Sequence, residues 1–223
     1  IKTSSVSLFL PLGISFFTFR ALSYLLDVYH GKMQAEKHPG MVALYIMFFP
    51  EIIAGPIDRP KTLISQFRQP VRFDYEKVTQ GLKLIAWGIF LKVVAADRLA
   101  IYVDTVFKSP KSYTGIPLIL SSIFFTFQIY YDFAGYSLIA IGSGRALGFD
   151  LLKNFNLPYT SRSIAEFWRR WHISLSTWFR DYLYIPLAGN RIKGWRWRVK
   201  IMVTFLLSGL WHGANWTLVL WGG

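Results

Sequence analysis

The chain has 223 residues, of which 53% are hydrophobic and 18% aromatic, and its formal net charge is +13. This composition is too apolar for a soluble domain of that length, and the long unbroken apolar runs exclude the alternating strands of an outer-membrane barrel. The basic residues lie between and beside these runs, which is typical of loops next to anionic lipid, so we expect membrane lipid and no nucleic acid as partners; the absence of cysteine excludes thiol chemistry.

The apolar stretches predict an all-α, polytopic transmembrane bundle, built as one integral-membrane domain over residues 1–223. In chain order we expect a first span, a broken or re-entrant segment, a charged connector, a helix and a long aromatic span, at 5–26, 40–57, 58–77, 78–96 and 115–142. We expect Asp132 and Gly135 to interrupt the aromatic span. Because the sequence begins inside an apolar stretch, without Met or a signal-peptide pattern, we expect it to be a fragment of a longer protein.

Two acidic residues, Glu51 and Asp132, lie within apolar sequence. A charge removed from water needs an opposite charge nearby, because its desolvation is otherwise uncompensated. The candidates for this pairing are Arg20, Arg59 and Arg145. We therefore expect each acid to form a structural ion pair with one of these arginines.

Residues 145–200 carry eleven lysines or arginines and three acids, which by the positive-inside rule places them on the cytoplasmic side. Ser163 and Glu166 have capping-box spacing, so an amphipathic helix is predicted to begin there and to end at Pro186. Its large apolar side chains fall on one face, as in a helix at the membrane surface or packed against the bundle: Ile164, Phe167, Trp168, Trp171, Leu175, Trp178, Phe179 and Tyr182. His172 lies at the edge of that face, which suits a residue lining a water-filled opening.

Residues 201–221 contain no Lys, Arg, Asp or Glu and are numerous enough to cross a bilayer as one helix, with His212 near its middle. An ionisable side chain at that depth indicates function, and a neutral imidazole would act there as a general base in a tunnel. The alternative is a core histidine satisfied by one hydrogen bond. His172 is open to the same choice, between a functional and an interfacial residue. Neither histidine is accompanied by HxxxH spacing or an acidic cluster, so we expect no metal.

Two long motifs carry a resemblance to a known family. They are "EFWRRWHISLSTWFRDYLYIPLAGNR" from Glu166 to Arg191 and "LLSGLWHGANWTLVLWG" from Leu206 to Gly222. Together with the upstream "FFPEIIAGPIDRP" and "YYDFAGYSLIAIG", they resemble the membrane-bound O-acyltransferases, specifically the bacterial branch similar to alginate O-acetyltransferases. Glu166, Ala188 and Leu138 depart from the family pattern, where Asp, Gly and Asp are usual, and these departures leave the acylated polymer open.

The resemblance implies a helical bundle around a central tunnel, in the bacterial inner membrane with several passes. It makes His212 the catalytic histidine and His172 the second active-site histidine. The donor implied is acetyl-CoA, entering from the cytoplasm, with no bound cofactor. Residues expected to contact the donor or orient the base are Arg169, Arg170, Arg191 and Asn215, although these arginines would equally suit lipid phosphates.

The function implied is transfer of an acetyl group towards hydroxyls of an exported polysaccharide such as alginate. The transfer would be direct or would pass through an extracytoplasmic acetyltransferase or acyl-carrier partner protein. Three alternatives stay open: D-alanyl transfer to teichoic acid, transport of polymer or protons without bond formation, and a non-catalytic scaffold in an export complex. The family's members are about twice as long as this chain, which agrees with a fragment.

Overall fold

The computed structural model describes residues 13–188, 195–213 and 215–222, and every regular element among them is a helix, as the sequence predicts. Of the predicted first span, residues 5–12 lie outside the described residues. The elements, with η1, η3 and η4 as 3₁₀ helices and η2 and η5 as π-helices, are α1 (Ile14–Tyr29), α2 (Pro39–Ile46), η1 (Phe49–Glu51), α3 (Pro60–Phe67), α4 (Tyr75–Ile89), η2 (Phe90–Ala96), α5 (Asp97–Lys108), η3 (Pro110–Ser112), α6 (Ile116–Ala146), η4 (Pro158–Thr160), α7 (Ile164–Arg170), α8 (Ile173–Phe179), η5 (Arg180–Tyr184), α9 (Ile185–Ala188), α10 (Trp195–His212) and α11 (Trp216–Gly222).

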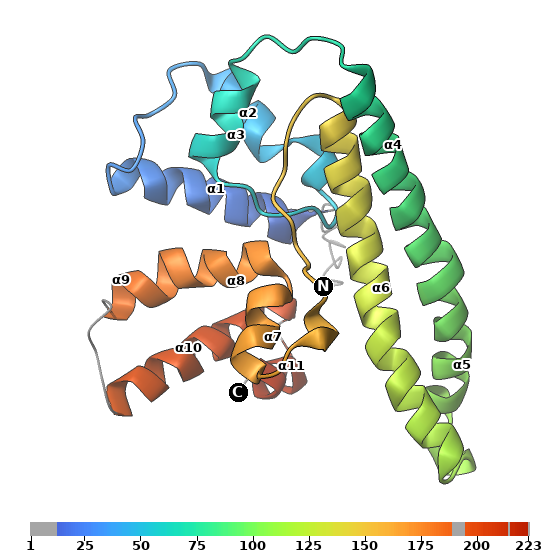
Figure 1. The fold of residues 1–223 in the computed structure, drawn as a ribbon. Coiled ribbons are helices and arrows are strands. Elements are labelled where there is room, and N and C mark those ends of the chain that lie inside the picture. Colours follow the sequence, from blue (N-terminus) through green and yellow to red (C-terminus); the bar gives the residue numbers. More distant parts are fainter. Residues whose placement is uncertain (1–12, 189–194, 214, 223) are drawn as a thin grey trace, which may run out of the picture.

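The helices α4, η2 and α5 run antiparallel to α6 and form a long hairpin at one side of the molecule (Figure 1). Glycines allow the two backbones to touch. A Cβ atom on Gly142 would lie 2.5 Å from the carbonyl oxygen of Gly81, and one on Gly88 would lie 2.6 Å from that of Gly135. Small residues at a helix interface permit this close approach, which larger side chains would prevent.

The α6 helix runs through 31 residues without interruption, so the predicted break at Asp132 and Gly135 is wrong. Gly135 serves helix packing, and the charge of Asp132 is paired across the hairpin. In the part of the chain that the structure describes, α6 is the one helix that is long and apolar enough to cross a membrane. The predicted helix at 78–96 does form, but it starts earlier and continues through α5 to Lys108.

The segment 40–57 is broken as predicted, because α2 ends at Ile46 and only the short η1 follows. Glu51 in η1 is fully buried and pairs with the buried Arg20 of α1, with 2.9 Å between Arg20 Nη2 and Glu51 Oε2, so the predicted arginine partner is confirmed for this acid. It is wrong for Asp132, whose ion pair is with Lys92 of η2. Lys92 also pairs with Asp97 at 2.7 Å and thereby ties η2 to both neighbouring helices.

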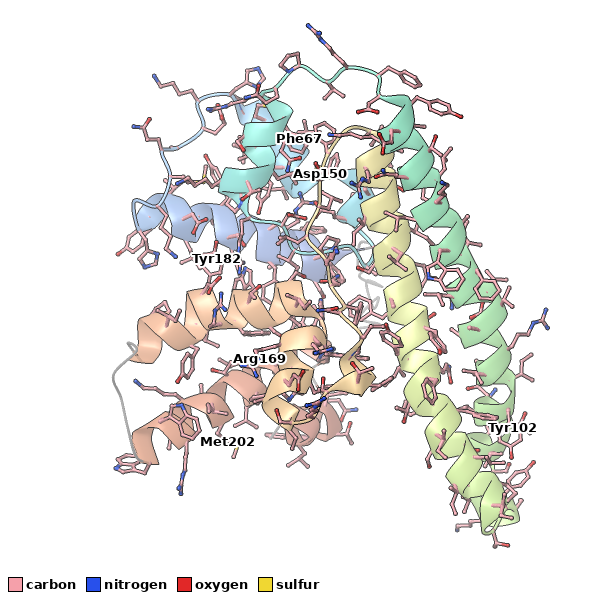
Figure 2. The ribbon with its side chains drawn as sticks, viewed as in Figure 1. Phe67, Tyr102, Asp150, Arg169, Tyr182 and Met202 are labelled. Atoms are coloured by element: carbon pink, nitrogen blue, oxygen red, sulfur yellow. The ribbon has the colours of Figure 1, made fainter. Side chains whose placement is uncertain are left out.

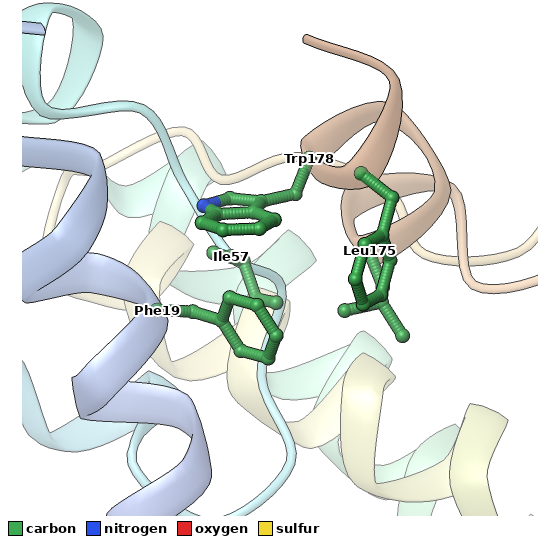
Figure 3. Close-up of a cluster of buried hydrophobic side chains, with 5 residues drawn as sticks. Phe19, Ile57, Leu175 and Trp178 are labelled. Carbon is green, nitrogen blue, oxygen red and sulfur yellow. The ribbon is translucent and has the colours of Figure 1, made fainter. Parts of the chain in front are cut away.

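A buried aromatic cluster fastens α8 to α1 and to the segment before α3 (Figure 3). The ring centroids of Phe19 and Trp178 are 4.4 Å apart in an edge-to-face arrangement, and Ile57 and Leu175 fill the space beside them. The indole nitrogen of Trp178 donates a hydrogen bond of 2.7 Å to Ser23 Oγ, so the polar atom of this large side chain is satisfied inside the core.

The chain segment from α8 to α9 lies between α1 and α10 (Figure 1). Tyr182 of η5 faces α1, where its ring lies beneath two cations, 5.0 Å from Lys32 Nζ and 4.9 Å from Arg59 Cζ (Figure 2). Arg59 also donates to Asp181 at 2.9 Å. The aromatic cluster and these polar contacts hold one side of the α8–η5 segment against α1. The opposite side of the segment faces α10 (Figure 1).

Candidate active site

The amphipathic helix predicted from Ser163 begins as expected but does not run on to Pro186. Ser163 Oγ accepts the backbone N–H of Glu166 at 3.1 Å, as a helix N-cap should. The helix then ends at Arg170, and a new helix starts after His172, which has φ 40° and ψ 56° in the left-handed region. His172 therefore occupies a break between two helices, where its side chain leaves the chain at a corner.

Pro186 does not end the second helix, contrary to prediction. The helix continues through Pro186 to Ala188, and the turn before it, η5, has π-helical geometry. Proline supplies no N–H and its ring collides with the carbonyl four residues earlier in a regular α-helix. A π-helical turn changes the hydrogen-bond register at that point, so the helix absorbs the proline without breaking.

The predicted span at 201–221 is also interrupted, because α10 ends at His212. Gly213 closes a turn in which its N–H donates to the carbonyl of Leu210 at 3.2 Å, and α11 begins at Trp216. Asn215 lies in the connection, where its Oδ1 accepts the N–H of Thr217 at 3.1 Å. His212 thus stands at the end of a helix and not in the middle of one, and Asn215 is not on the same helical face.

Both histidines line one open pocket of about 480 Å³, whose other lining residues come from α6, η4, α7, α8, η5 and α10 and from the connection at Trp171. Most of its wall is apolar and aromatic, and five residues of the predicted apolar face contribute to it: Phe167, Trp168, Trp171, Leu175 and Phe179. The polar residues of the wall are His172, Ser176, Arg180, Thr204, Ser208 and His212. A concave, mostly apolar pocket with a few convergent polar groups is the usual form of a small-molecule site.

His172 is the buried histidine of the pair, with 3% of its surface exposed. Its ring packs edge-on against Phe133, with 4.6 Å between centroids, and its Nε2 atom is buried without a hydrogen-bond partner among the described residues. Burial is the larger cause and the nearby His212 the smaller one, and together they lower the pKa of His172 to about 3. The imidazole is therefore neutral at physiological pH, with an unused nitrogen in the pocket wall.

The indole ring of Trp211 lies near the rings of both histidines. Its ring centroid lies 6.4 Å from that of His172 and 4.7 Å from that of His212. The other side of the indole packs against Phe19 of the aromatic cluster, with centroids 5.2 Å apart. His212 itself is exposed on the pocket wall within the described part of the chain. The same cluster that holds α8 therefore also fixes the end of α10 that carries His212.

The arginines predicted to bind the donor are not gathered at this pocket. Arg170 is held by Glu166 at 2.6 Å and by Thr160 Oγ1 at 3.0 Å. Arg169 lies on α7 (Figure 2), where it is exposed, and it is not among the residues that line the pocket. Arg191 lies outside the described residues.

Sequence reasoning missed Arg180, which does line the pocket. Its Nε donates to Asp181 at 2.8 Å, and its side chain is 59% exposed, so the guanidinium is accessible to a ligand. A signal was present in the sequence, since Arg180 directly follows Phe179, a member of the predicted apolar face. A basic residue at the boundary of an apolar face is placed to bring its charge to the rim of a pocket.

The comparisons with known proteins identify the family of this chain. The model of the membrane-bound O-acyltransferase family matches residues 16–223. The chain is 46% identical over 213 residues to the probable alginate O-acetylase of Azotobacter vinelandii (96% of this chain, 42% of that protein) and 38% identical over 244 residues to the peptidoglycan O-acetyltransferase of Helicobacter pylori (98% and 46%). It is 30% identical over 224 residues to the teichoic acid D-alanyltransferase of Streptococcus thermophilus (95% and 54%).

The chain spans about half the length, or less, of these relatives. The family match, in contrast, covers nearly the whole chain and includes the helix break at His172, the end of α10 at His212 and the wall of the pocket between them. The chain therefore belongs to the membrane-bound O-acyltransferase family, whose members are membrane proteins.

Proposed function

We propose that the protein to which this chain belongs moves an acetyl group from a cytoplasmic donor, acetyl-CoA, towards hydroxyls of an exported cell-surface polysaccharide such as alginate. The observation that carries this proposal is the convergence of His172 and His212 on one apolar pocket. The 46% identity to the probable alginate O-acetylase, against 30% to the teichoic acid D-alanyltransferase, supports acetyl transfer over D-alanyl transfer.

In the proposed reaction His212 is the general base. Its imidazole takes the proton of the attacking hydroxyl as the oxygen bonds to the thioester carbonyl carbon. The carbon–sulfur bond then breaks, and the same proton passes from the imidazolium to the departing thiolate. The exposed position of His212 on the pocket wall supports this role, because a base must reach the substrate that it deprotonates.

His172 is proposed to stabilise the charge that develops on the carbonyl oxygen. Its Nε2 atom is buried and unpaired among the described residues, so as an N–H it would donate to that oxygen without first breaking another hydrogen bond. A donor fixed before the reaction in apolar surroundings stabilises an oxyanion more strongly than water does. The neutral imidazole still carries a proton on one of its nitrogens, so it can act as this donor.

The donor's phosphates are proposed to lie at the rim of the pocket, beside Arg180. Arg169, Arg170 and Arg191 remain proposed donor contacts, and Arg170 would reach a phosphate only by exchanging its bond to Glu166. Asn215 remains a proposed orienting residue near His212. We further propose several membrane passes in the bacterial inner membrane, a tunnel that joins the two sides, and an extracytoplasmic acetyltransferase or acyl-carrier protein as partner.

The proposal is tested with the full-length protein and its partner proteins, supplied with acetyl-CoA labelled in the acetyl group. We expect label on the polysaccharide for wild type and for His38→Ala, whose exposed histidine lies in a distant loop, and none for His212→Ala. Acetylation that survives His212→Ala but not deletion of the protein would identify a scaffold. Polymer export that depends on His212, without any transfer of label by wild type, would identify a transporter.

A further inference from the structure

The backbone of His172 is strained, and a segment distant in the sequence holds it. A non-glycine residue in the left-handed region costs on the order of 1–3 kcal/mol and persists only where its surroundings impose it. Residues 154–156 run beside the break: the N–H of Asn156 donates to the carbonyl of Arg170 at 2.9 Å, and the N–H of Ile173 donates to the carbonyl of Asn154 at 2.8 Å. Hydrogen bonds on both sides of His172 therefore hold its backbone in the left-handed conformation and keep the two helices from joining.

Side chains extend this clamp into the core. The backbone N–H of Ile57 donates to Ser174 Oγ at 3.0 Å, and the Ser174 hydroxyl donates its own hydrogen to Asn154 Oδ1 at 2.6 Å. All three residues are at most 1% exposed. Because a hydroxyl has a single hydrogen, Ser174 accepts from one segment and donates to the other, so these two bonds join three segments two residues after His172.

We propose that Asn154 and Ser174 are positioning residues, which hold His172 in the left-handed conformation that turns its imidazole into the pocket. Neither side chain lines the pocket, so any effect on the reaction acts through His172. The inference rests on the proposed function for its catalytic consequence, while its structural part concerns only the placement of the ring. Without the Ser174–Asn154 bond, the backbone of His172 relaxes towards ordinary helical φ and ψ angles, and its imidazole moves away from the ring of Phe133.

The test compares Ser174→Ala and Asn154→Leu with the control Thr177→Val in the full-length protein. Thr177 lies on the same helix, and among the described residues its hydroxyl bonds to carbonyls of that helix alone, those of Ile173 and Ser174. We expect kcat for acetyl transfer to fall about 100-fold in the two test variants, as for a misplaced catalytic group, with the KM for acetyl-CoA unchanged. The double variant should be no worse than the worse single variant, because both remove the same link.

A second measurement follows His172 directly and does not depend on activity. The rate at which diethyl pyrocarbonate modifies His172, read by mass spectrometry, should rise several-fold in Ser174→Ala and Asn154→Leu and stay at the wild-type rate in Thr177→Val. If wild type transfers no acetyl group but the rates separate in this way, the proposed function fails and the positioning role stands. Modification rates and kcat that match the control in both test variants would overturn the positioning role. Ser174→Thr keeps the hydroxyl, so it should show the wild-type modification rate and the wild-type kcat.

Discussion

Replacing Arg20 should destabilise the protein more than replacing its partner Glu51. Arg20, Glu51 and Asp58 are all at most 1% exposed, and both acids lie close enough to Arg20 to interact with its charge. Arg20→Met leaves two buried carboxylates without their cation, and removing one partner of a buried pair costs about 3–5 kcal/mol. Glu51→Gln keeps Asp58 beside the guanidinium and removes only one of the two acids that interact with it, so the loss of stability should be smaller.

The measurement is the free energy of unfolding of the full-length protein in detergent, from denaturant titration of wild type and each variant. Lys108→Met is the matched control, since Lys108 pairs with Asp104 at 3.5 Å while their side chains are 78% and 59% exposed; its stability should stay close to that of wild type. The double variant Arg20→Met/Glu51→Leu should be more stable than Arg20→Met alone. A larger loss for Glu51→Gln than for Arg20→Met would refute the reasoning, because it would mean that Asp58 does not share the cation.

Three further predictions concern the hairpin, the buried histidine and the rim of the pocket. Gly142→Ala should lower the free energy of unfolding by about 1–3 kcal/mol in thermal unfolding, because its Cβ meets backbone, whereas Gly40→Ala meets only a side chain and should be tolerated. As pH falls from about 6.5 towards 3, the unfolded chain binds a proton that folded His172 does not, so wild type should lose more stability than His172→Asn over this range; equal losses would contradict the low pKa. Arg180→Ala should raise the KM for acetyl-CoA about tenfold or more, the size of a charged hydrogen bond, while Lys111→Ala in the distant η3 turn should leave it unchanged.

The elements that depend on local signals were predictable from the sequence. The helix start at Ser163 follows from the capping spacing with Glu166, and the broken segment around Glu51 follows from its prolines. The break at His172 carries no comparable signal, because the apolar periodicity continues through it and neither His172 nor Trp171 disfavours helix strongly. It arises from hydrogen bonds to residues 154–156, which no local pattern reveals.

The end of α10 is a different case, because its signal was present but outweighed. Gly213 directly after His212 is typical of a helix C-terminus, yet the 21 uncharged residues favoured one continuous span. The structure brings His172 and His212 to one pocket and adds Arg180, which directly follows Phe179 of the predicted apolar face in the sequence and was passed over there. Motif spacing identifies candidate site residues, and the tertiary contacts between distant segments determine which of them line the same pocket.

The two halves of the structure differ in how far apart in the sequence their contacts lie. The hairpin of α4, η2, α5 and α6 is closed by one short connection, whereas the bonds that seat α8 join residues 117 and 155 positions apart, Ile57 with Ser174 and Ser23 with Trp178. Closing a longer stretch of chain costs more entropy and is slower. The hairpin should accordingly form early in folding and the histidine pocket late. A chain whose folding stops between these two steps would contain the long helices but not the pocket that brings His172 and His212 together.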